Sequence, residues 1–171
     1  STVDLASEEA WLFFDHIKPY TVIQQYKNAI RINGQPLVVD ENARVNVYAH
    51  GTVVVPHTPT FQPLEAFTEK NYGGESARYR LHDYHNSLGE MNDRIRSFKL
   101  KRGYMATVAT RSNGLDYSRV YIADREDLLV PELPAELDRS ISFIRVFRWE
   151  WPSKKGWAGD ENLGNMVDAT W

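Results

Sequence analysis

The side chains best suited to bind a ligand lie near the end of the sequence, where aromatic and apolar residues alternate. Ile144 and Val146 fit the core positions of a strand. Because successive strand residues point to opposite faces, the other face receives Phe143, Arg145, Phe147, Trp149 and Trp151. An indole can stack on the C–H face of a pyranose while an arginine hydrogen-bonds its hydroxyls. Alternatively, the N-terminal strands around Trp11 and Phe13 cover this face, because an aromatic ladder is costly to leave in water.

A second cluster, His82-Asp83-Tyr84-His85, contains side chains that could ligate a metal ion. Residues three apart on an extended segment point to opposite faces, so a metal site would require a turn here. We therefore expect no metal and no cofactor. The ligand-binding residues predicted from the sequence are Trp149, Trp151, Trp11, Tyr84, Arg145 and Asp83.

Catalytic chemistry has only weak support in the sequence. Glycosidases use pairs of carboxylates, but every domain with this many acidic residues offers such pairs. The scattered candidates are Glu65, Glu69, Asp83 and Glu90. The sequence has no G-x-S-x-G motif, no phosphate-binding loop and no H-E-x-x-H motif. We therefore expect a chain that binds rather than one that catalyses.

Composition narrows the class of protein. At 171 residues and 19.7 kDa, the chain can bury a proper core. A net charge of −3 and a pI near 5.9 argue against nucleic-acid binding, which usually needs a basic surface. The apolar runs are far shorter than the roughly 18 residues of a bilayer span, so no membrane span is expected. Cysteine is absent, and the chain starts Ser1-Thr2-Val3, as a mature or excised fragment would.

One basic stretch is interleaved with the apolar residues Ile95, Phe98 and Leu100. Its members are Arg94, Arg96, Lys99, Lys101 and Arg102. We interpret it as the solvated outer face of a strand whose apolar partners point inward. The alternative is attraction to an anionic partner such as a sulfated or uronic polysaccharide.

The N-terminal third predicts short strands joined by tight turns. Residues 20–32 alternate loosely, and Asn33-Gly34 separates them from a second apolar run at 36–39, which predicts strand, turn, strand. Residues 43–50 and 52–55 flank Gly51 as a further hairpin. The proline-rich run 56–63 cannot pair regularly in a sheet and is the best internal boundary.

From residue 64 onward the sequence contains two similar blocks. The first ends in the segment 92–100 and the second in 138–146, and aligning them places Ile95 opposite Ile141. Each has a polar turn, an apolar anchor and an alternating strand. In the first block, Phe67 and Tyr72 precede a glycine pair, as in a hairpin folded back on its own sheet.

These residues resemble the βγ-crystallin family, whose domains are two Greek-key motifs packed as a small sandwich. Phe67, Tyr72 and Gly74 match its aromatic and glycine signature, with Ser76 following. The second hairpin, residues 112–118, keeps a glycine and a serine but lacks the paired aromatics. The resemblance covers residues 60–150 approximately and implies an all-β Greek-key β-sandwich, here with additional N-terminal strands.

Many microbial members bind calcium through an N/D-N/D-x-x-S/T-S stretch in each motif, and the resemblance makes this a possible function here. Calcium takes carbonyl, carboxylate and hydroxyl oxygens. Asn92 and Asp93 match the first stretch, but Arg96 stands at its hydroxyl position. In the second stretch Ser142 matches, whereas Arg139 replaces an acidic residue. The added positive charges disfavour calcium.

The sequence therefore predicts a sandwich module over residues 1–152, with accessory strands at 1–58 and the two-motif unit at 59–152. Residues 153–171 are expected to be linker or tail, and from 154 onward they resemble the start of the first strand of a (β/α)8 glycoside hydrolase. The predicted function is a non-catalytic carbohydrate-binding module that holds a secreted or cell-surface enzyme on its polysaccharide, neutral or anionic, beside an adjacent catalytic domain. The alternatives are a structural or calcium-stabilised docking domain and a fragment of a glycoside hydrolase.

Overall fold

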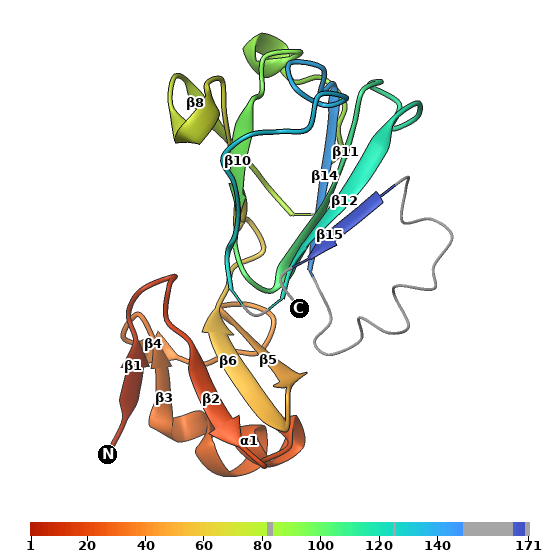
Figure 1. The fold of residues 1–171 in the computed structure, drawn as a ribbon. Helices are drawn as coiled ribbons and strands as arrows, with labels where there is room; N and C mark the ends of the chain where they lie inside the picture. The colour runs from red at the N-terminus through yellow and green to blue at the C-terminus, as the bar shows by residue number, and fades with distance from the viewer. Residues whose placement is uncertain (82–83, 125, 149–165, 170–171) are drawn as a thin grey trace. The chain divides into compact units, whose positions relative to one another are not determined.

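The chain forms two compact units joined within its proline-rich run (Figure 1). The computed structural model describes residues 1–81, 84–124, 126–148 and 166–169. The first unit contains Ser1–Phe61, and the second begins at Gln62. In the described part of the chain, no helix has both the length and the apolar character needed to cross a membrane.

The first unit combines two three-stranded sheets with one short helix. In one sheet the order is β1-β3-β4, with β1 parallel to β3, and in the other it is β2-β6-β5, with all pairs antiparallel. Its elements are β1 (Val3–Leu5), β2 (Leu12–Asp15), α1 (Pro19–Tyr26), a 3-10 turn (Lys27–Ala29), β3 (Ile30–Ile32), β4 (Gln35–Pro36), β5 (Ala43–Tyr48) and β6 (Gly51–Pro56).

The strand predicted for residues 20–32 is wrong over most of its length, because residues 19–26 form helix α1. Pro19 occupies the first turn of the helix, where its fixed φ and missing N–H are tolerated. Val22 and Tyr26 are spaced four apart, which places them on one helical face, and Val22 is buried. Only Ile30–Ile32 is a strand.

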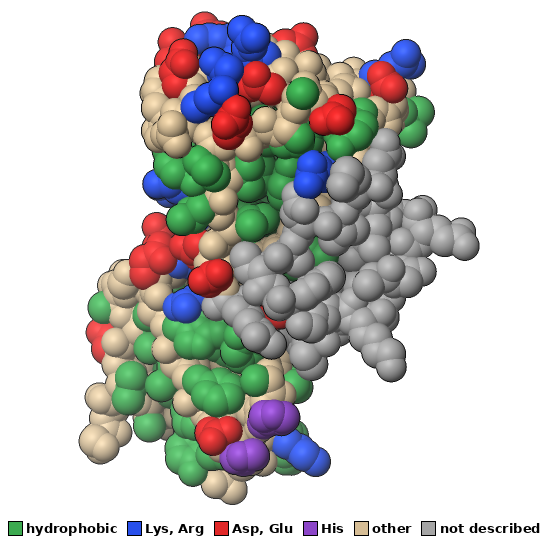
Figure 2. All heavy atoms as spheres, viewed as in Figure 1, with side chains coloured by type: hydrophobic (Ala, Val, Ile, Leu, Met, Phe, Trp, Pro, Cys, Tyr) green, Lys and Arg blue, Asp and Glu red, His purple; other side chains and the backbone are tan. Residues whose placement is uncertain are grey.

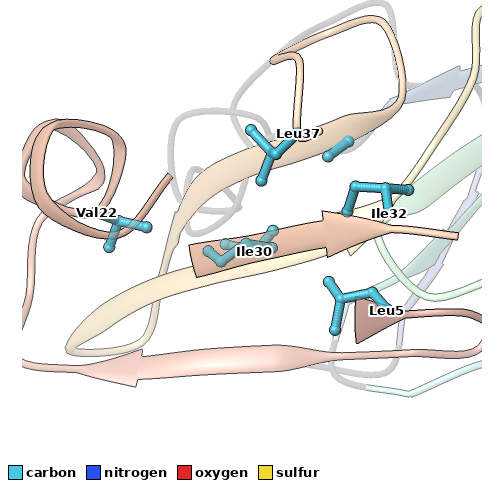
Figure 3. Packing of buried hydrophobic residues seen from close by; sticks show 7 residues of the cluster. Leu5, Val22, Ile30, Ile32 and Leu37 are labelled. Carbon is cyan, nitrogen blue, oxygen red and sulfur yellow. The ribbon is translucent and has the colours of Figure 1, made fainter. Parts of the chain in front are cut away.

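The core of the first unit joins the helix to both sheets. Val22 points from α1 toward Ile30 of β3, and Leu5 and Ile32 lie at the other end of the same cluster (Figure 3). Leu12 and Phe14 of β2 pack against it from the second sheet. The helix is too short to be stable alone, so this burial holds it in place.

Both hairpins predicted in the first unit are present. Asn33 and Gly34 have positive φ and form the two-residue turn between β3 and β4, where the Gly34 N–H donates to Asp4 Oδ1 over 2.9 Å. In the second hairpin the turn is Ala49-His50, and Gly51 already belongs to β6. A Cβ on Gly51 would overlap the Phe14 carbonyl, so this glycine permits close pairing with β2.

The second unit is an all-β sandwich. Its sheets have the orders β13-β10-β7-β8 and β15-β12-β11-β14-β9. The strands are β7 (Leu64–Phe67), β8 (Ser76–Tyr79), β9 (Tyr84–His85), β10 (Ser97–Leu100), β11 (Tyr104–Ala109), β12 (Ser118–Ala123), β13 (Leu128–Val130), β14 (Phe143–Arg148) and β15 (Met166–Ala169), with 3-10 turns at Lys70–Tyr72 and Gly89–Met91.

The two sequence blocks exchange one strand each. Strand β9 follows β8 in the chain but pairs with β14 of the second block, and β13 follows β12 but pairs with β10 of the first. This exchange interlocks the blocks as two Greek keys, which confirms the predicted all-β Greek-key sandwich. Strand β15 pairs in parallel with β12 and lies in the segment that we expected to be a tail.

The equivalent apolar anchors of the two blocks are both buried in the sandwich core. Ile95 and Ile141 are both buried, as the block alignment predicts, and so are Ile144 and Val146 on the core face of β14. Between the sheets, the rings of Phe98 and Tyr121 meet edge to face at 4.8 Å, where burial of large apolar area supplies most of the stability.

Gly74 is expected to tolerate a side chain less well than Gly89. It has a φ of +74°, and a Cβ there would overlap the Thr68 hydroxyl, whereas Gly89, with a φ of +59°, has open space. Gly74→Ala should lower the free energy of unfolding by about 3 kcal/mol and Gly89→Ala by about 1 kcal/mol, because only the first combines strain with a clash. Urea unfolding measures both, and equal losses would contradict the packing role.

Candidate functional site

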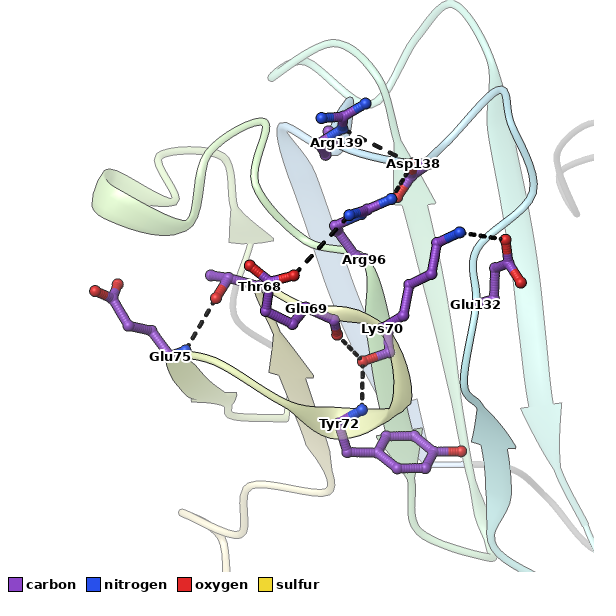
Figure 4. A network of polar contacts seen from close by, with 10 residues as sticks. Thr68, Glu69, Lys70, Tyr72, Glu75, Arg96, Glu132, Asp138 and Arg139 are labelled. Carbon is purple, nitrogen blue, oxygen red and sulfur yellow. Dashed lines mark hydrogen bonds and ion pairs between the residues drawn. The ribbon is translucent and has the colours of Figure 1, made fainter.

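The loop that follows β7 is held by buried polar side chains rather than prepared for a ligand. The Ser97 hydroxyl donates to the Glu69 carbonyl over 2.6 Å and accepts from the Tyr72 N–H over 3.0 Å (Figure 4). The Thr68 hydroxyl accepts from the Glu75 N–H over 2.9 Å. These bonds replace the ladder pairs that the loop lacks, so its polar groups serve the fold.

The equivalent loop of the second block, between β11 and β12, uses a ring in place of these bonds. The block alignment places Phe143 where the first block has Ser97. Gly114, with a φ of +81°, lies so close to the Phe143 ring that a Cβ would meet it at 3.4 Å. Phe143 thus fills the space under the loop, which explains why this hairpin folds without the paired aromatics of the first.

The two stretches with calcium-like sequences are joined to each other by side chains. Arg96 donates to both carboxylate oxygens of Asp138, from Nε over 3.1 Å and from Nη2 over 3.3 Å (Figure 4). Ser142, which the block alignment matches with Arg96, donates its hydroxyl in the opposite direction, to Asp93 Oδ1 over 3.1 Å. Each stretch therefore supplies one partner to the other, across 42 and 49 residues of sequence.

The guanidinium of Arg96 supplies the positive charge at this junction. The Asp138 side chain is 19% exposed, so an unpaired carboxylate would be poorly hydrated there. The hydrogen bond that Arg96 donates to Asp138 raises the pKa of the Arg96 guanidinium above its ordinary value. Arg139 Nε lies 3.8 Å from the same carboxylate. Because two cations already neutralise Asp138, these residues do not fit a calcium ion, and the described residues contain no cluster of three metal-ligating side chains.

The basic stretch does not form an open anion-binding surface. Arg94 Nη1 lies 3.1 Å from Glu75 Oε2, and Lys99 Nζ lies over the Tyr72 ring, 4.7 Å from its centre. Arg96 is bound to Asp138. Figure 2 shows basic and acidic side chains interleaved over the second unit. The local positive charge is therefore largely compensated, which favours the structural interpretation of this stretch over the anionic partner.

The structure describes three of the six predicted ligand-binding residues, Tyr84, Arg145 and Trp11. Trp149, Trp151 and Asp83 lie outside the described residues. Tyr84 in β9 pairs through its backbone with Arg145 in β14, so the fold brings these two positions together. The sixth residue, Trp11, belongs to the first unit.

The face of β14 that carries Arg145 is buried at its centre. The Arg145 guanidinium lies over the Phe147 ring at 4.4 Å. On the same face of the sheet, Met105, Val120 and Ile122 are exposed by only 2%, 0% and 0%. Side chains of this parity point away from the sandwich interior, so their burial argues against an open ligand platform at the centre of the described part of this face.

Trp11 takes part in an aromatic cluster on the sheet β2-β6-β5, which we call the aromatic patch. It comprises Trp11, Phe13 and Tyr48. The Tyr48 ring meets Trp11 at 5.1 Å and Phe13 at 6.1 Å, both edge to face. Phe13 is 38% exposed, and its strand neighbours Leu12 and Phe14 face the core instead. Tyr48 is absent from the sequence prediction, although the alternation along residues 43–48 puts it opposite the core-facing Val45.

Comparison with solved structures finds similarity to βγ-crystallin domains. No protein-family model and no curated protein matches the sequence. A βγ-crystallin domain from Flavobacterium johnsoniae is 30% identical, with a TM-score of 0.43, and the match covers 50% of this chain and 94% of that domain. A βγ-crystallin domain from Clostridium beijerinckii is 17% identical over 50% of this chain and 98% of its own, with a TM-score of 0.42. The N-terminal domain of protein S is 19% identical over 50% and 94%, also with a TM-score of 0.42.

Two observations decide the class of the second unit: the strand exchange, and the 30% sequence identity to the Flavobacterium domain in a match that covers 94% of that domain. The second unit is a βγ-crystallin-like domain. The resemblance seen at Phe67, Tyr72 and Gly74 is therefore confirmed at the level of the fold. In this βγ-crystallin-like domain the two calcium-like stretches are closed by Arg96 and Ser142.

Tyr79, at the end of β8, carries a buried hydroxyl. The residue is 6% exposed, its ring meets His85 edge to face at 5.0 Å, and its Oη has no hydrogen-bond partner in the described part of the βγ-crystallin-like domain. Burial raises the pKa of Tyr79 above its ordinary value of 10.0, because the phenolate would lose its hydration. The phenol of Tyr79 is thus neutral at physiological pH.

Arg96 should contribute more to stability than its neighbour Arg94. Arg96→Met leaves Asp138 without its bidentate partner in a poorly hydrated position, whereas Arg94→Met removes a pair whose side chains are 48% and 62% exposed. We expect a clear fall of the urea midpoint for Arg96→Met and almost none for Arg94→Met.

Adding calcium to the native chain should leave the thermal midpoint unchanged, and a large rise would contradict the assignment of Arg96 as the resident cation.

Tyr79 should destabilise the domain in alkali. In the unfolded chain Tyr79 ionises near pH 10, whereas in the folded chain its raised pKa keeps the phenol neutral to higher pH. The contribution of neutral Tyr79 to the free energy of unfolding is therefore complete below pH 10 and is lost as the pH rises further. Tyr79→Phe should flatten the decline of stability above pH 10 and leave stability near pH 7 within about 1 kcal/mol of the native value. Chemical unfolding across this range measures it, with Tyr20→Phe, at a 74% exposed side chain, as the control. A decline as steep as the native one would show that Tyr79 is not involved.

Proposed function

We propose that this chain is a non-catalytic carbohydrate-binding module whose sugar-binding surface is the aromatic patch of the first unit. The observation that carries the proposal is the cluster of Trp11, Phe13 and Tyr48 on one face of the sheet β2-β6-β5. Aromatic rings fixed on a sheet offer apolar surface to the C–H face of a pyranose at little cost in conformational entropy.

Polar groups border the aromatic patch on the same face. Asn46 lies two residues before Tyr48 in β5, so both side chains point to the same side. Asp15 lies two residues after Phe13 in β2. Gly51 of β6 pairs with Asp15 on one side and with Tyr48 on the other, so Asp15 and Tyr48 lie in the same row across the sheet. An amide and a carboxylate beside aromatic rings can hydrogen-bond sugar hydroxyls and so select among glycans.

The role of such a module is attachment. A single shallow surface gives modest affinity, but linkage to a catalytic domain raises the effective concentration of that domain on an insoluble glycan. The full protein would be a secreted or cell-surface polysaccharide-degrading enzyme, with a glycoside hydrolase as the adjacent domain.

Affinity electrophoresis in gels containing neutral, uronic or sulfated polysaccharides tests the proposal. We expect at least one polysaccharide to retard the native chain, Trp11→Ala to abolish the retardation, and Phe13→Ala to weaken it several-fold, because each removes a stacking ring. Tyr20→Ala, on an exposed position of α1 outside the aromatic patch, is the matched control.

Two outcomes would contradict this assignment. If none of the polysaccharides retards the native chain, the binding function is wrong. If Trp149→Ala or Trp151→Ala abolishes retardation while Trp11→Ala and Phe13→Ala do not, the surface lies at the C-terminal tryptophans instead.

A second candidate function is a purely structural domain that needs no calcium. The pairs Arg96–Asp138 and Ser142–Asp93 favour it, because they close the two stretches with groups of the chain itself. Such a domain would stabilise or dock its neighbour without binding a glycan. The calcium titration described for Arg96 separates this candidate from a calcium-stabilised one, and retardation by a polysaccharide separates it from the binding module.

A further inference from the structure

A pocket of about 370 Å³ opens within the first unit, at one end of its core. Its apolar floor includes Leu5 of β1 and Ile32 of β3, which lie together at that end of the cluster (Figure 3). Its wall includes Phe61, which packs against the buried His57 with ring centres 6.1 Å apart. This volume is at the lower end of the range for small-molecule sites, enough for one or two sugar rings rather than a chain.

The rim of the pocket carries polar side chains with free hydrogen-bonding capacity. Glu8, Gln35 and Thr58 line it and are exposed, and in the described part of the chain their side chains make no hydrogen bond. A carboxylate, an amide and a hydroxyl together offer both donors and acceptors. They stand around an apolar floor, which is the arrangement that a hydroxyl-rich ring with an apolar face requires.

The charge of the pocket narrows its ligand. The lining residues, all between Leu5 and Phe61, include the carboxylate of Glu8 and no lysine or arginine. A uronate or sulfate would be repelled by Glu8 and would find no lysine or arginine among the lining residues to pair with. A neutral sugar pays no such penalty, and a carboxylate is a strong acceptor for its hydroxyl groups.

We infer that this pocket binds the terminal pyranose of a neutral glycan. The ring lies with its C–H face toward Phe61 and the apolar floor, and its hydroxyls reach Glu8, Gln35 and Thr58. The inference rests on the proposed carbohydrate-binding function and adds to it an end-recognising site, separate from the aromatic patch, with a preference for neutral chains.

Isothermal titration calorimetry of the full chain tests this with soluble oligosaccharides from disaccharide to hexasaccharide, neutral and uronic. For a neutral series, end recognition predicts an affinity per molecule that stops rising beyond the trisaccharide. Glu8→Gln and Gln35→Ala should each weaken binding about tenfold, because the first replaces a charged acceptor with a weaker neutral one and the second removes a hydrogen bond to a sugar hydroxyl. Glu41→Gln and Gln25→Ala make the same changes at exposed positions outside the pocket and should have no effect.

The results separate the pocket from the wider function. Affinity that grows with every added sugar, a preference for uronic chains, or full binding by both Glu8→Gln and Gln35→Ala would overturn the pocket while the binding module stands. Failure of all oligosaccharides to bind, with polysaccharides still retarding the chain in gels, would likewise overturn the pocket alone. Loss of both kinds of binding in the native chain would overturn the proposed function itself.

Discussion

The exchange of β9 and β13 between the two sheets is the constraint on which the second unit depends. Each block lacks one strand of its own sheet and completes the sheet of the other. Neither block can therefore bury its apolar face alone, and the two must fold together. The Arg96–Asp138 pair lies between the same two blocks, so the polar junction and the strand exchange reinforce one topology.

The sequence predicts those features that depend on local pattern. Asn33-Gly34 specifies a two-residue turn by its backbone conformation alone, and the aligned anchors Ile95 and Ile141 follow from strand alternation. The helix at Pro19–Tyr26 escapes prediction because eight residues carry too little periodicity to outweigh a loose alternation. Tertiary packing of Val22, which a local pattern does not contain, stabilises the helix there.

The candidate site is harder to predict because its parts are distant in sequence. Trp11 is recognisable as an aromatic near the start, but its neighbour Tyr48 joins it only through the pairing of β2 and β5 with β6. Arg96 and Asp138 are likewise 42 residues apart, and the sequence shows only that a hydroxyl has been replaced by an arginine. The replacement becomes intelligible once the facing carboxylate is known.

A charge built into the chain differs from a bound ion in its dependence on the surroundings. An ion stabilises a fold by an amount that rises with its free concentration and vanishes on dilution or chelation, because mass action governs its occupancy. The guanidinium of Arg96 is present at full occupancy in every molecule and stays protonated over the whole physiological range. The positive charge that offsets Asp138 is therefore present in every medium, including media whose divalent cations are scarce or bound by acidic polymers.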